Sequence, residues 1–227
     1  MTVEFLHYLE VEKGLSANTL SAYRRDIQKL EKFARSRKKK LEILGPSDIR
    51  DFLRDLHRRG LSHRSIARIL SAVRGLYRFA AAEGRIATDP TEQIESARIP
   101  RGLPRYLSFD DVDSLLAAPD ASTPEGLRDK TMLETLYATG LRVSELIRLR
   151  IEDVHLDARY LLCEGKGRKE RIVPLGRSAS RWIQDYLSKA RPELAKGGSS
   201  WLFLSRRGGP MTRQRFWQII KACGRRA

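Results

Sequence analysis

The longest amphipathic pattern in this sequence runs from Ser62 to Ala80, and it constrains the fold more than any other stretch. Its apolar residues recur at steps of three and four, which places them along one face of a helix. Ser62 can cap the N-terminus of that helix. The stripe comprises Ile66, Ile69, Leu70, Val73, Leu76, Tyr77 and Ala80, and Arg64, Arg68, Arg74 and Arg78 are set off it. The pattern predicts a helix with one buried face and a basic outer face.

Three shorter helices are predicted before it. Apolar residues fall at helical spacing in segments 5–9, 20–33 and 49–56, and Ser16 and Ser47 are the predicted N-caps of the second and third helices. Four short helices of this kind form a compact bundle. The basic run from Arg35 to Lys40 ends the second helix, and it fits a basic patch or a solvated loop equally well.

The helical pattern lapses after Glu95, and the segment 99–104 holds two prolines and a glycine. These residues favour extended backbone, so we expect a linker at 97–106 between a helical domain at 1–96 and a second domain at 107–227. The second domain is predicted to be mainly α with a small β-sheet. Its helices are predicted to begin at Ser108, at Gly126, near Trp182 and at Thr212, and its strands to be 160–164, 171–175 and 201–204.

A glycine corner interrupts the helices of the second domain. Tyr137 shares the helical spacing of two nearby leucines and is predicted to belong to the core. Gly140 suits a helix C-terminus that requires positive φ. Arg142 follows the corner, where its rigid fork of donors can hold a phosphate. On spacing alone, an i, i+3 surface pair between Arg142 and Glu145 is the stronger interpretation.

The balance of charge indicates an anionic partner. Lys plus Arg number 44 against 28 Asp plus Glu, a net charge of +16. Residues 1–100 hold 20 basic and 13 acidic residues and residues 101–227 hold 24 and 15, so both halves are basic. Nucleic acid is the commonest such partner, although ribosomal and membrane-surface proteins share this balance.

Several other classes are disfavoured by the sequence. Cys163 and Cys223 lie far apart and form no CxxC pair, which argues against a metal site or a disulfide framework. The first residues carry acids and lack the apolar core of a signal peptide, and no apolar run is long enough to span a membrane. We therefore expect a cytoplasmic protein with buried thiols.

The segment 165–170, Gly-Lys-Gly-Arg-Lys-Glu, forms the tip of a predicted hairpin. It is not a P-loop, because no glycine stands at the required earlier position and no serine or threonine follows Lys166. A tip that carries Lys166, Arg168 and Lys169 without a nucleotide motif suits insertion into a groove of nucleic acid.

Four motifs in this order resemble the tyrosine recombinases of the Xer type. They are Asn18-Thr-Leu-Ser-Ala-Tyr-Arg-Arg-Asp, Ala138-Thr-Gly-Leu-Arg-Val-Ser-Glu-Leu, Gly165-Lys-Gly-Arg-Lys-Glu-Arg-Ile-Val-Pro-Leu and Met211-Thr-Arg-Gln. The resemblance implies an N-terminal SAM-like core-binding domain and an α+β catalytic domain that close on double-stranded DNA, in DNA integration or chromosome partition. It implies cleavage and rejoining through a 3′-phosphotyrosyl bond, by four protomers on two sites, without metal or cofactor.

The same resemblance implies roles for single residues. Arg142 matches the arginine that stabilises the phosphate charge, and Lys166 matches the lysine that protonates the leaving 5′-oxygen. For DNA contacts, mainly to phosphates, we expect a set of residues in both halves. They are Thr19, Tyr23, Arg24, Arg64 and Arg68, followed by Lys169, Arg171 and Arg213.

The sequence also departs from the family. The family has a His-x-x-Arg pair and a nucleophilic tyrosine, but none of the four histidines precedes an arginine by three, and the last tyrosine is Tyr186. We therefore expect a catalytic domain that is incomplete at its C-terminus, and a chain that alone is a monomer that binds DNA without cleaving it. A non-catalytic, regulatory derivative of a recombinase is the alternative. A ribosomal or other RNA-binding protein explains the charge but not the motifs.

Overall fold

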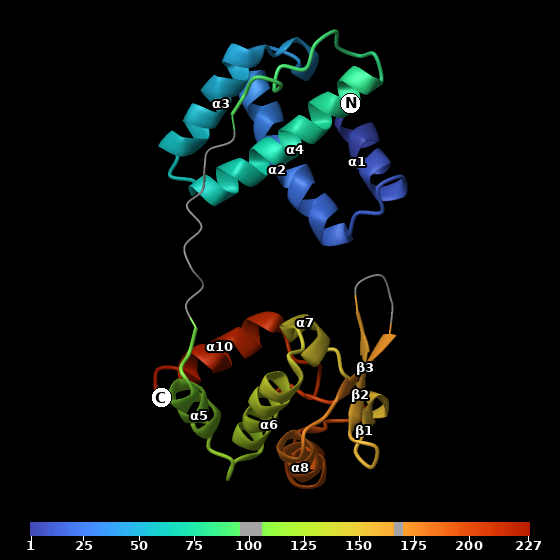
Figure 1. Cartoon of the computed structure of the whole chain (residues 1–227), viewed down its shortest axis with the longest axis vertical. Helices are drawn as coiled ribbons and strands as arrows, with labels where there is room; N and C mark the ends of the chain where they lie inside the picture. The colour runs from blue at the N-terminus through green and yellow to red at the C-terminus, as the bar shows by residue number, and fades with distance from the viewer. Residues whose placement is uncertain (96–105, 166–169) are drawn as a thin grey trace. The chain divides into compact units, whose positions relative to one another are not determined.

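The computed structural model describes residues 1–95, 106–165 and 170–227, and it divides the chain into two compact units, Met1–Leu103 and Pro104–Ala227 (Figure 1). Nearly all of the expected linker, together with Lys166, Arg168 and Lys169, lies outside the described residues. In the described parts, no helix is both long and apolar enough to cross a membrane. The two units are described separately.

The first unit is the predicted bundle of helices. They are α1 (Thr2–Val11), α2 (Ala17–Ser36), α3 (Pro46–Arg58) and α4 (His63–Ala82), with the 3₁₀ turn η1 (Leu41–Ile43) after α2. Ser16 and Ser62 cap α2 and α4 as predicted, each accepting from the backbone N–H three residues on. The predicted cap Ser47 is wrong. Gly45 is the N-cap of α3, because Pro46 already has the backbone angle of a first helical residue and Asp48 accepts from Gly45 N at 3.0 Å.

The apolar stripe of α4 forms the centre of this unit. All its members are buried except Ile66, which is half-buried. Tyr77 lies in this core, and its hydroxyl donates to the carbonyl of Leu41 at 2.9 Å. Burial raises the pKa of Tyr77 above its ordinary value. The hydroxyl therefore stays protonated and serves to hold η1 against α4.

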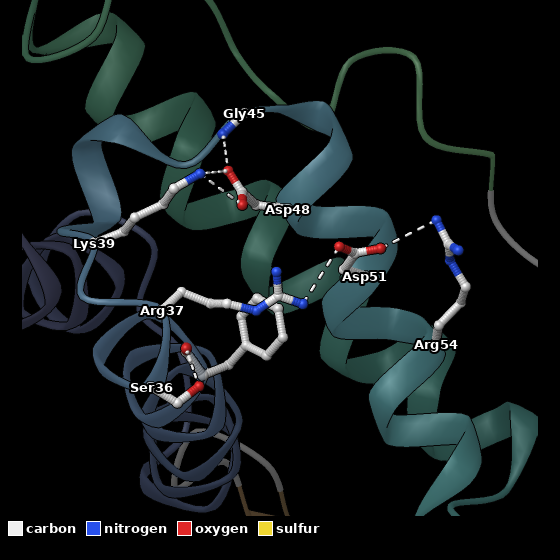
Figure 2. A network of polar contacts seen from close by, with 8 residues as sticks. Ser36, Arg37, Lys39, Gly45, Asp48, Asp51 and Arg54 are labelled. Atoms are coloured by element: carbon white, nitrogen blue, oxygen red, sulfur yellow. Dashed lines mark hydrogen bonds and ion pairs between the residues drawn. The ribbon is translucent and has the colours of Figure 1, made fainter.

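The basic run at 35–40 is partly tied down rather than fully solvated (Figure 2). Arg37 pairs with Asp51 at 3.4 Å, and Lys39 reaches both oxygens of Asp48 at 2.8 Å. Arg54 pairs with the other oxygen of Asp51 at 3.1 Å. The remaining members of the run, Arg35, Lys38 and Lys40, are exposed. The run is therefore neither wholly a solvated loop nor wholly free to act as a basic patch. Arg37 and Lys39 pair with carboxylates of α3, and the other three basic side chains face solvent.

The second unit packs short helices around α6 (Pro124–Thr139), with a small sheet at one side of them (Figure 1). The other helices are α5 (Phe109–Ala117), α7 (Val143–Leu146), α8 (Arg177–Asp185), the π-helical η3 (Tyr186–Ala190), α9 (Arg191–Leu194) and α10 (Arg213–Cys223). Ser108 and Thr212 cap α5 and α10 as predicted. Cys163 and Cys223 are both buried and unpaired, as expected.

The sheet has three antiparallel strands in the order β1 (Val154–His155), β2 (Tyr160–Glu164) and β3 (Glu170–Pro174), preceded by the 3₁₀ turn η2 (Ile151–Asp153). The predicted hairpin is confirmed, with Cys163 opposite Arg171 and Glu164 opposite Glu170 at the end next to its loop. The two-residue β1 gave no signal in the sequence, because so short a strand has no periodicity.

The predicted strand at 201–204 is wrong. Only two isolated bridges form there, Arg150 with Trp201 and Leu204 with Pro210. The segment is apolar because it is buried, and long polar side chains satisfy its backbone. Arg191 donates to the carbonyls of Trp201 and Leu202, and Arg128 donates to that of Leu204 at 2.9 Å.

Candidate active site and DNA interface

The corner predicted around Gly140 forms as expected. Gly140 has φ 61° and ψ 22°, the left-handed conformation that glycine adopts without strain, and its N–H donates to Leu136 at 3.0 Å. α6 ends there, Leu141 is buried, and Arg142 becomes the N-cap residue of α7. The corner therefore anchors the backbone of Arg142 between two buried leucines, Leu141 and Leu146.

Arg142 is held by Glu145 at two points. Its backbone N–H donates to Glu145 Oε2 at 2.8 Å, and its Nη1 donates to Oε1 at 3.0 Å. The arginine side chain is 73% exposed, whereas that of Glu145 is only 7% exposed. The pair expected from the spacing is therefore confirmed. It orients the guanidinium while leaving most of that group in solvent, so the pair does not exclude phosphate binding.

Arg171 on β3 grips the same carboxylate. Its Nη1 and Nη2 donate to Oε1 and Oε2 of Glu145 at 3.1 and 2.8 Å. The Arg171 hydrogen bonds, more than those from Arg142, lower the pKa of Glu145 to about 2 against the opposing effect of burial. The carboxylate is thus charged at any physiological pH. From the sequence we expected Arg171 to contact DNA, and this pairing was not foreseen, since 26 residues separate the two partners.

Tyr137 is not in the core, contrary to the prediction. Its side chain is 57% exposed, although Leu133 one turn earlier is buried. Tyr137 and Ala138 lie in the last turn of α6, and both are exposed. The last turn of α6 is therefore partly buried on one side, where Leu136 packs against the core, and exposed on the side of Tyr137. Helical spacing predicts which face is apolar, but not how far along that face the neighbouring elements extend.

In the second unit, the predicted contact Arg213 is the first residue of α10. Its side chain is exposed, and among the described residues it has no ion pair. Arg171 is engaged by Glu145, as above. Lys166 and Lys169 lie outside the described residues, between the paired ends Glu164 and Glu170 of β2 and β3.

In the first unit, the predicted contacts lie on α2 and α4, which pack against each other. Thr19 and Tyr23 are half-buried near the start of α2, whereas Arg24 and Arg64 are exposed and without an ion pair in the described part of the chain. Arg68 differs from them because it pairs with the buried Asp26 of α2. Arg64 precedes Arg68 by one turn on the same face of α4.

The comparisons with known proteins agree over nearly the whole chain. The phage integrase family matches residues 105–227, and the N-terminal SAM-like domain of phage integrases matches residues 3–84. The tyrosine recombinase XerD of Listeria monocytogenes is 43% identical over 222 residues, which are 96% of this chain and 75% of that protein. XerD of Pseudomonas aeruginosa is 48% identical over 218 residues, 96% of this chain and 73% of that protein.

Solved structures share the fold. A XerH site-specific recombinase bound to palindromic difH substrate superposes with a TM-score of 0.73 at 19% identity, covering all of this chain and 69% of that one. A lambda integrase dimer bound to a COC′ core site gives a TM-score of 0.70 at 22% identity, covering 97% of this chain and 81% of that one. The expected fold, a helical SAM-like domain followed by an integrase domain with a small sheet, is thereby confirmed.

Proposed function

The chain belongs to the phage integrase family of tyrosine recombinases, and from that premise we propose that both its units bind duplex DNA and that Arg142 and Lys166 act on the DNA phosphate at the point of cleavage. Site-specific recombination is the activity of its XerD relatives. The roles of the individual residues go further than that likeness and rest on the chemistry of the site.

The observation that carries the proposal is the state of Arg142. Its backbone is fixed by the Gly140 corner, one nitrogen is held by Glu145, and the rest of the guanidinium faces solvent. A guanidinium oriented in advance stabilises the charge that builds on the non-bridging phosphate oxygens without reorganising during the reaction. Removing one such donor typically slows an enzyme by about two to three orders of magnitude.

Lys166 supplies the second part of the chemistry. In the family resemblance it protonates the 5′-oxygen as that oxygen leaves, so that the departing strand is a neutral hydroxyl. Its assignment rests on the motif, because the residue lies outside the described part of the structure. A nucleophilic tyrosine then carries the 3′-phosphate until a second strand attacks it.

Of the arginines expected from the sequence to contact DNA, Arg24, Arg64 and Arg213 are the proposed phosphate contacts, because each is exposed and lacks a carboxylate partner among the described residues, whereas Arg68 and Arg171 are paired. Thr19 and Tyr23 precede Arg24 on α2 and are proposed to approach the same DNA backbone. The excess of basic residues in both halves supports binding through both units. Solved relatives include a lambda integrase tetramer bound to a Holliday junction, and we propose a similar assembly for a protein with the full set of catalytic residues.

The polypeptide of residues 1–227, taken by itself, is proposed to bind DNA without cutting it. None of its four histidines belongs to a His-x-x-Arg pair. Tyr77 and Tyr186 are buried, and burial raises the pKa of each, so neither is available to attack a phosphate. Tyr137 is exposed near the corner and is the tyrosine that most needs an experimental test.

The test combines a binding assay with a covalent-adduct assay. Fluorescence anisotropy with a labelled duplex, at several salt concentrations, should show binding that weakens steeply as salt rises. Denaturing gels with a nicked duplex should show no protein–DNA adduct. An adduct that survives SDS would overturn the proposed inactivity, and replacing Tyr137 by Phe would show whether that residue carries it. Absence of binding at low salt would overturn the proposal of DNA binding.

A further inference from the structure

Glu145 lies between two arginines with every acceptor site in use. Oε1 accepts from Nη1 of Arg142 at 3.0 Å and from Nη1 of Arg171 at 3.1 Å. Oε2 accepts from the backbone N–H of Arg142 and from Nη2 of Arg171, both at 2.8 Å. A carboxylate offers about four acceptor positions, so this one is saturated. The two arginines are therefore joined through a single rigid group.

The two arginines are not equivalent. Arg171 commits two nitrogens of its fork, side by side, to the carboxylate, whereas among the described residues the side chain of Arg142 commits only Nη1 and is 73% exposed. If Arg171 turned to a phosphate, it would leave behind a buried carboxylate that had lost its strongest partner, which is costly. Arg142 can bind a phosphate without giving up its contacts. The geometry assigns the phosphate to Arg142 and the carboxylate to Arg171.

Arg171 also lies near the loop end of the hairpin. It faces Cys163 across the β2–β3 ladder, and the next pair, Glu164 with Glu170, is the last described before the tip. Lys166 is five residues before Arg171 in the sequence. The bidentate pair to Glu145 thus ties the loop end of this hairpin to α7, the helix that begins after Arg142.

We propose that Arg171 is a positioning residue, which acts through Glu145 to fix strand β3 against the corner that carries Arg142, and which does not itself contact DNA. This inference rests on the proposed function of Arg142 and Lys166, and it replaces the DNA contact that the sequence suggested for Arg171. The low pKa of Glu145, about 2, agrees with it, because the linking carboxylate remains charged under all conditions in which DNA is bound.

Two substitutions at Arg171 separate positioning from direct contact. Arg171→Lys keeps the charge but loses the planar fork, whereas Arg171→Met loses both. If Arg171 acts by position, both variants should weaken duplex affinity by a similar factor, about tenfold. Arg177→Met is the matched control, since it removes the same charge from an exposed arginine that follows the far end of β3. It should change affinity by less than about twofold.

A double-mutant cycle with Glu145→Gln gives the second measurement. If Arg171 acts through Glu145, then Arg171→Met should have little further effect on affinity in the Glu145→Gln background. A direct DNA contact would instead cost the same factor in both backgrounds. Circular dichroism confirms that each variant is folded, and if the Gln variant is not, the comparison of Lys with Met at Arg171 decides alone.

The outcomes are distinct. Near-normal affinity for Arg171→Lys with a loss for Arg171→Met would overturn the inference in favour of a direct charge contact. Normal affinity for both would show that Arg171 has no part in binding. Additive effects in the cycle would likewise overturn it. Failure of the unsubstituted polypeptide to bind any duplex would instead refute the proposed function.

Discussion

Arg68 on α4 forms an ion pair with Asp26 on α2, and the carboxylate of Asp26 is only 1% exposed. Lys29 reaches the other oxygen of the same carboxylate at 3.1 Å. A buried carboxylate needs such partners, because leaving it uncompensated costs several kcal/mol. Arg68 therefore stabilises the packing of α2 against α4. Arg64, one turn earlier on α4, forms no ion pair with a carboxylate among the described residues. Two arginines that look alike in the sequence thus have different roles.

Arg68→Ala should destabilise the first unit by about 2 kcal/mol. The loss stays below the ~3–5 kcal/mol of a fully orphaned buried charge because Lys29 remains. All three tryptophans, Trp182, Trp201 and Trp217, lie in the second unit, so tryptophan fluorescence follows that unit alone. The circular dichroism transition should shift while the fluorescence transition does not. A shift of the fluorescence transition by the same amount would contradict this assignment.

Arg64→Ala should leave stability within about 0.5 kcal/mol of the unsubstituted protein and act on DNA binding instead. Loss of one phosphate contact should reduce the slope of log K against log salt by about one. Arg78→Ala is the control, since it removes an exposed arginine from the same helix that is not a proposed contact. Equal slopes for the Arg64 variant and the unsubstituted protein would remove Arg64 from the interface.

Much of the fold could be predicted because it depends on short-range chemistry. The caps Ser16, Ser62, Ser108 and Thr212 each accept from a backbone N–H three residues away, so the cap and the helix start are encoded together. The end of α6 at Gly140 could be predicted for the same reason, since a helix that ends with a residue in the left-handed conformation favours glycine there. The prediction of Ser47 as a cap was wrong because Pro46 starts the helix, so that the N-cap is Gly45, two residues earlier.

The parts that failed depend on contacts between distant segments. The run 201–204 has the composition of a strand, but Arg128 and Arg191 satisfy its backbone, and nothing in the local pattern indicates them. The pairing of Arg171 with Glu145 is equally remote in sequence. Spacing could pair Glu145 with Arg142, but it could not place a second arginine on the same carboxylate. The sequence thus indicated the residues of the candidate site and the pairing of Arg142 with Glu145, but not the pairing of Arg171 with the same carboxylate.

The hydrogen bonds from Arg171 and Arg142 to Glu145 should make the stability of the second unit fall measurably in acid. Arg171 and Arg142 lower the pKa of Glu145 from 4.5 to about 2 in the folded protein. A lowered folded pKa means that the stabilisation is fully present above about pH 4.5 and is lost as the pH falls toward 2. Over that window the unsubstituted protein should lose about 2 kcal/mol more than Glu145→Gln. Guanidinium unfolding followed by tryptophan fluorescence at several pH values measures the difference.

The Gln variant is the internal control for every other group that titrates in the same window. Glu4 and Asp48 of the first unit and Asp111 and Asp120 of the second unit also have lowered pKa values, and the substitution changes none of these carboxyl groups. If the difference in unfolding free energy between the unsubstituted protein and Glu145→Gln stays constant between pH 4.5 and 2, protonation of Glu145 does not destabilise the folded protein.

The left-handed conformation of Gly140 should make it costly to replace. A methyl group added there would meet no atom within 4 Å, so Gly140→Ala tests the backbone alone. The strain of φ 61° should destabilise the second unit by about 1 kcal/mol. Gly176→Ala is the control, because Gly176 has φ −66° and is equally unobstructed. A loss of similar size at both positions would show that the effect does not come from the left-handed angle.

Arg128 is the most deeply buried cation among the described residues, with a side chain only 2% exposed. It donates to Asp129 and to the carbonyl of Leu204, and so joins α6 to the segment 201–204. Arg128→Met leaves a largely buried carboxylate and an unsatisfied carbonyl, which should cost about 3–5 kcal/mol. Arg206→Met, which removes an arginine paired with Glu125 at the surface, should cost less than about 1 kcal/mol.

The pH dependence identifies Asp129 as the source of that cost. Burial already raises the pKa of Asp129 in the presence of Arg128, and removing the arginine should raise it further. A raised folded pKa means that the folded state binds the proton more tightly, so the deficit of Arg128→Met should narrow as the pH is lowered toward that pKa. Adding Asp129→Asn should recover part of the lost stability at neutral pH. A deficit that is the same at every pH, and in the double variant, would assign the loss to the carbonyl of Leu204 instead.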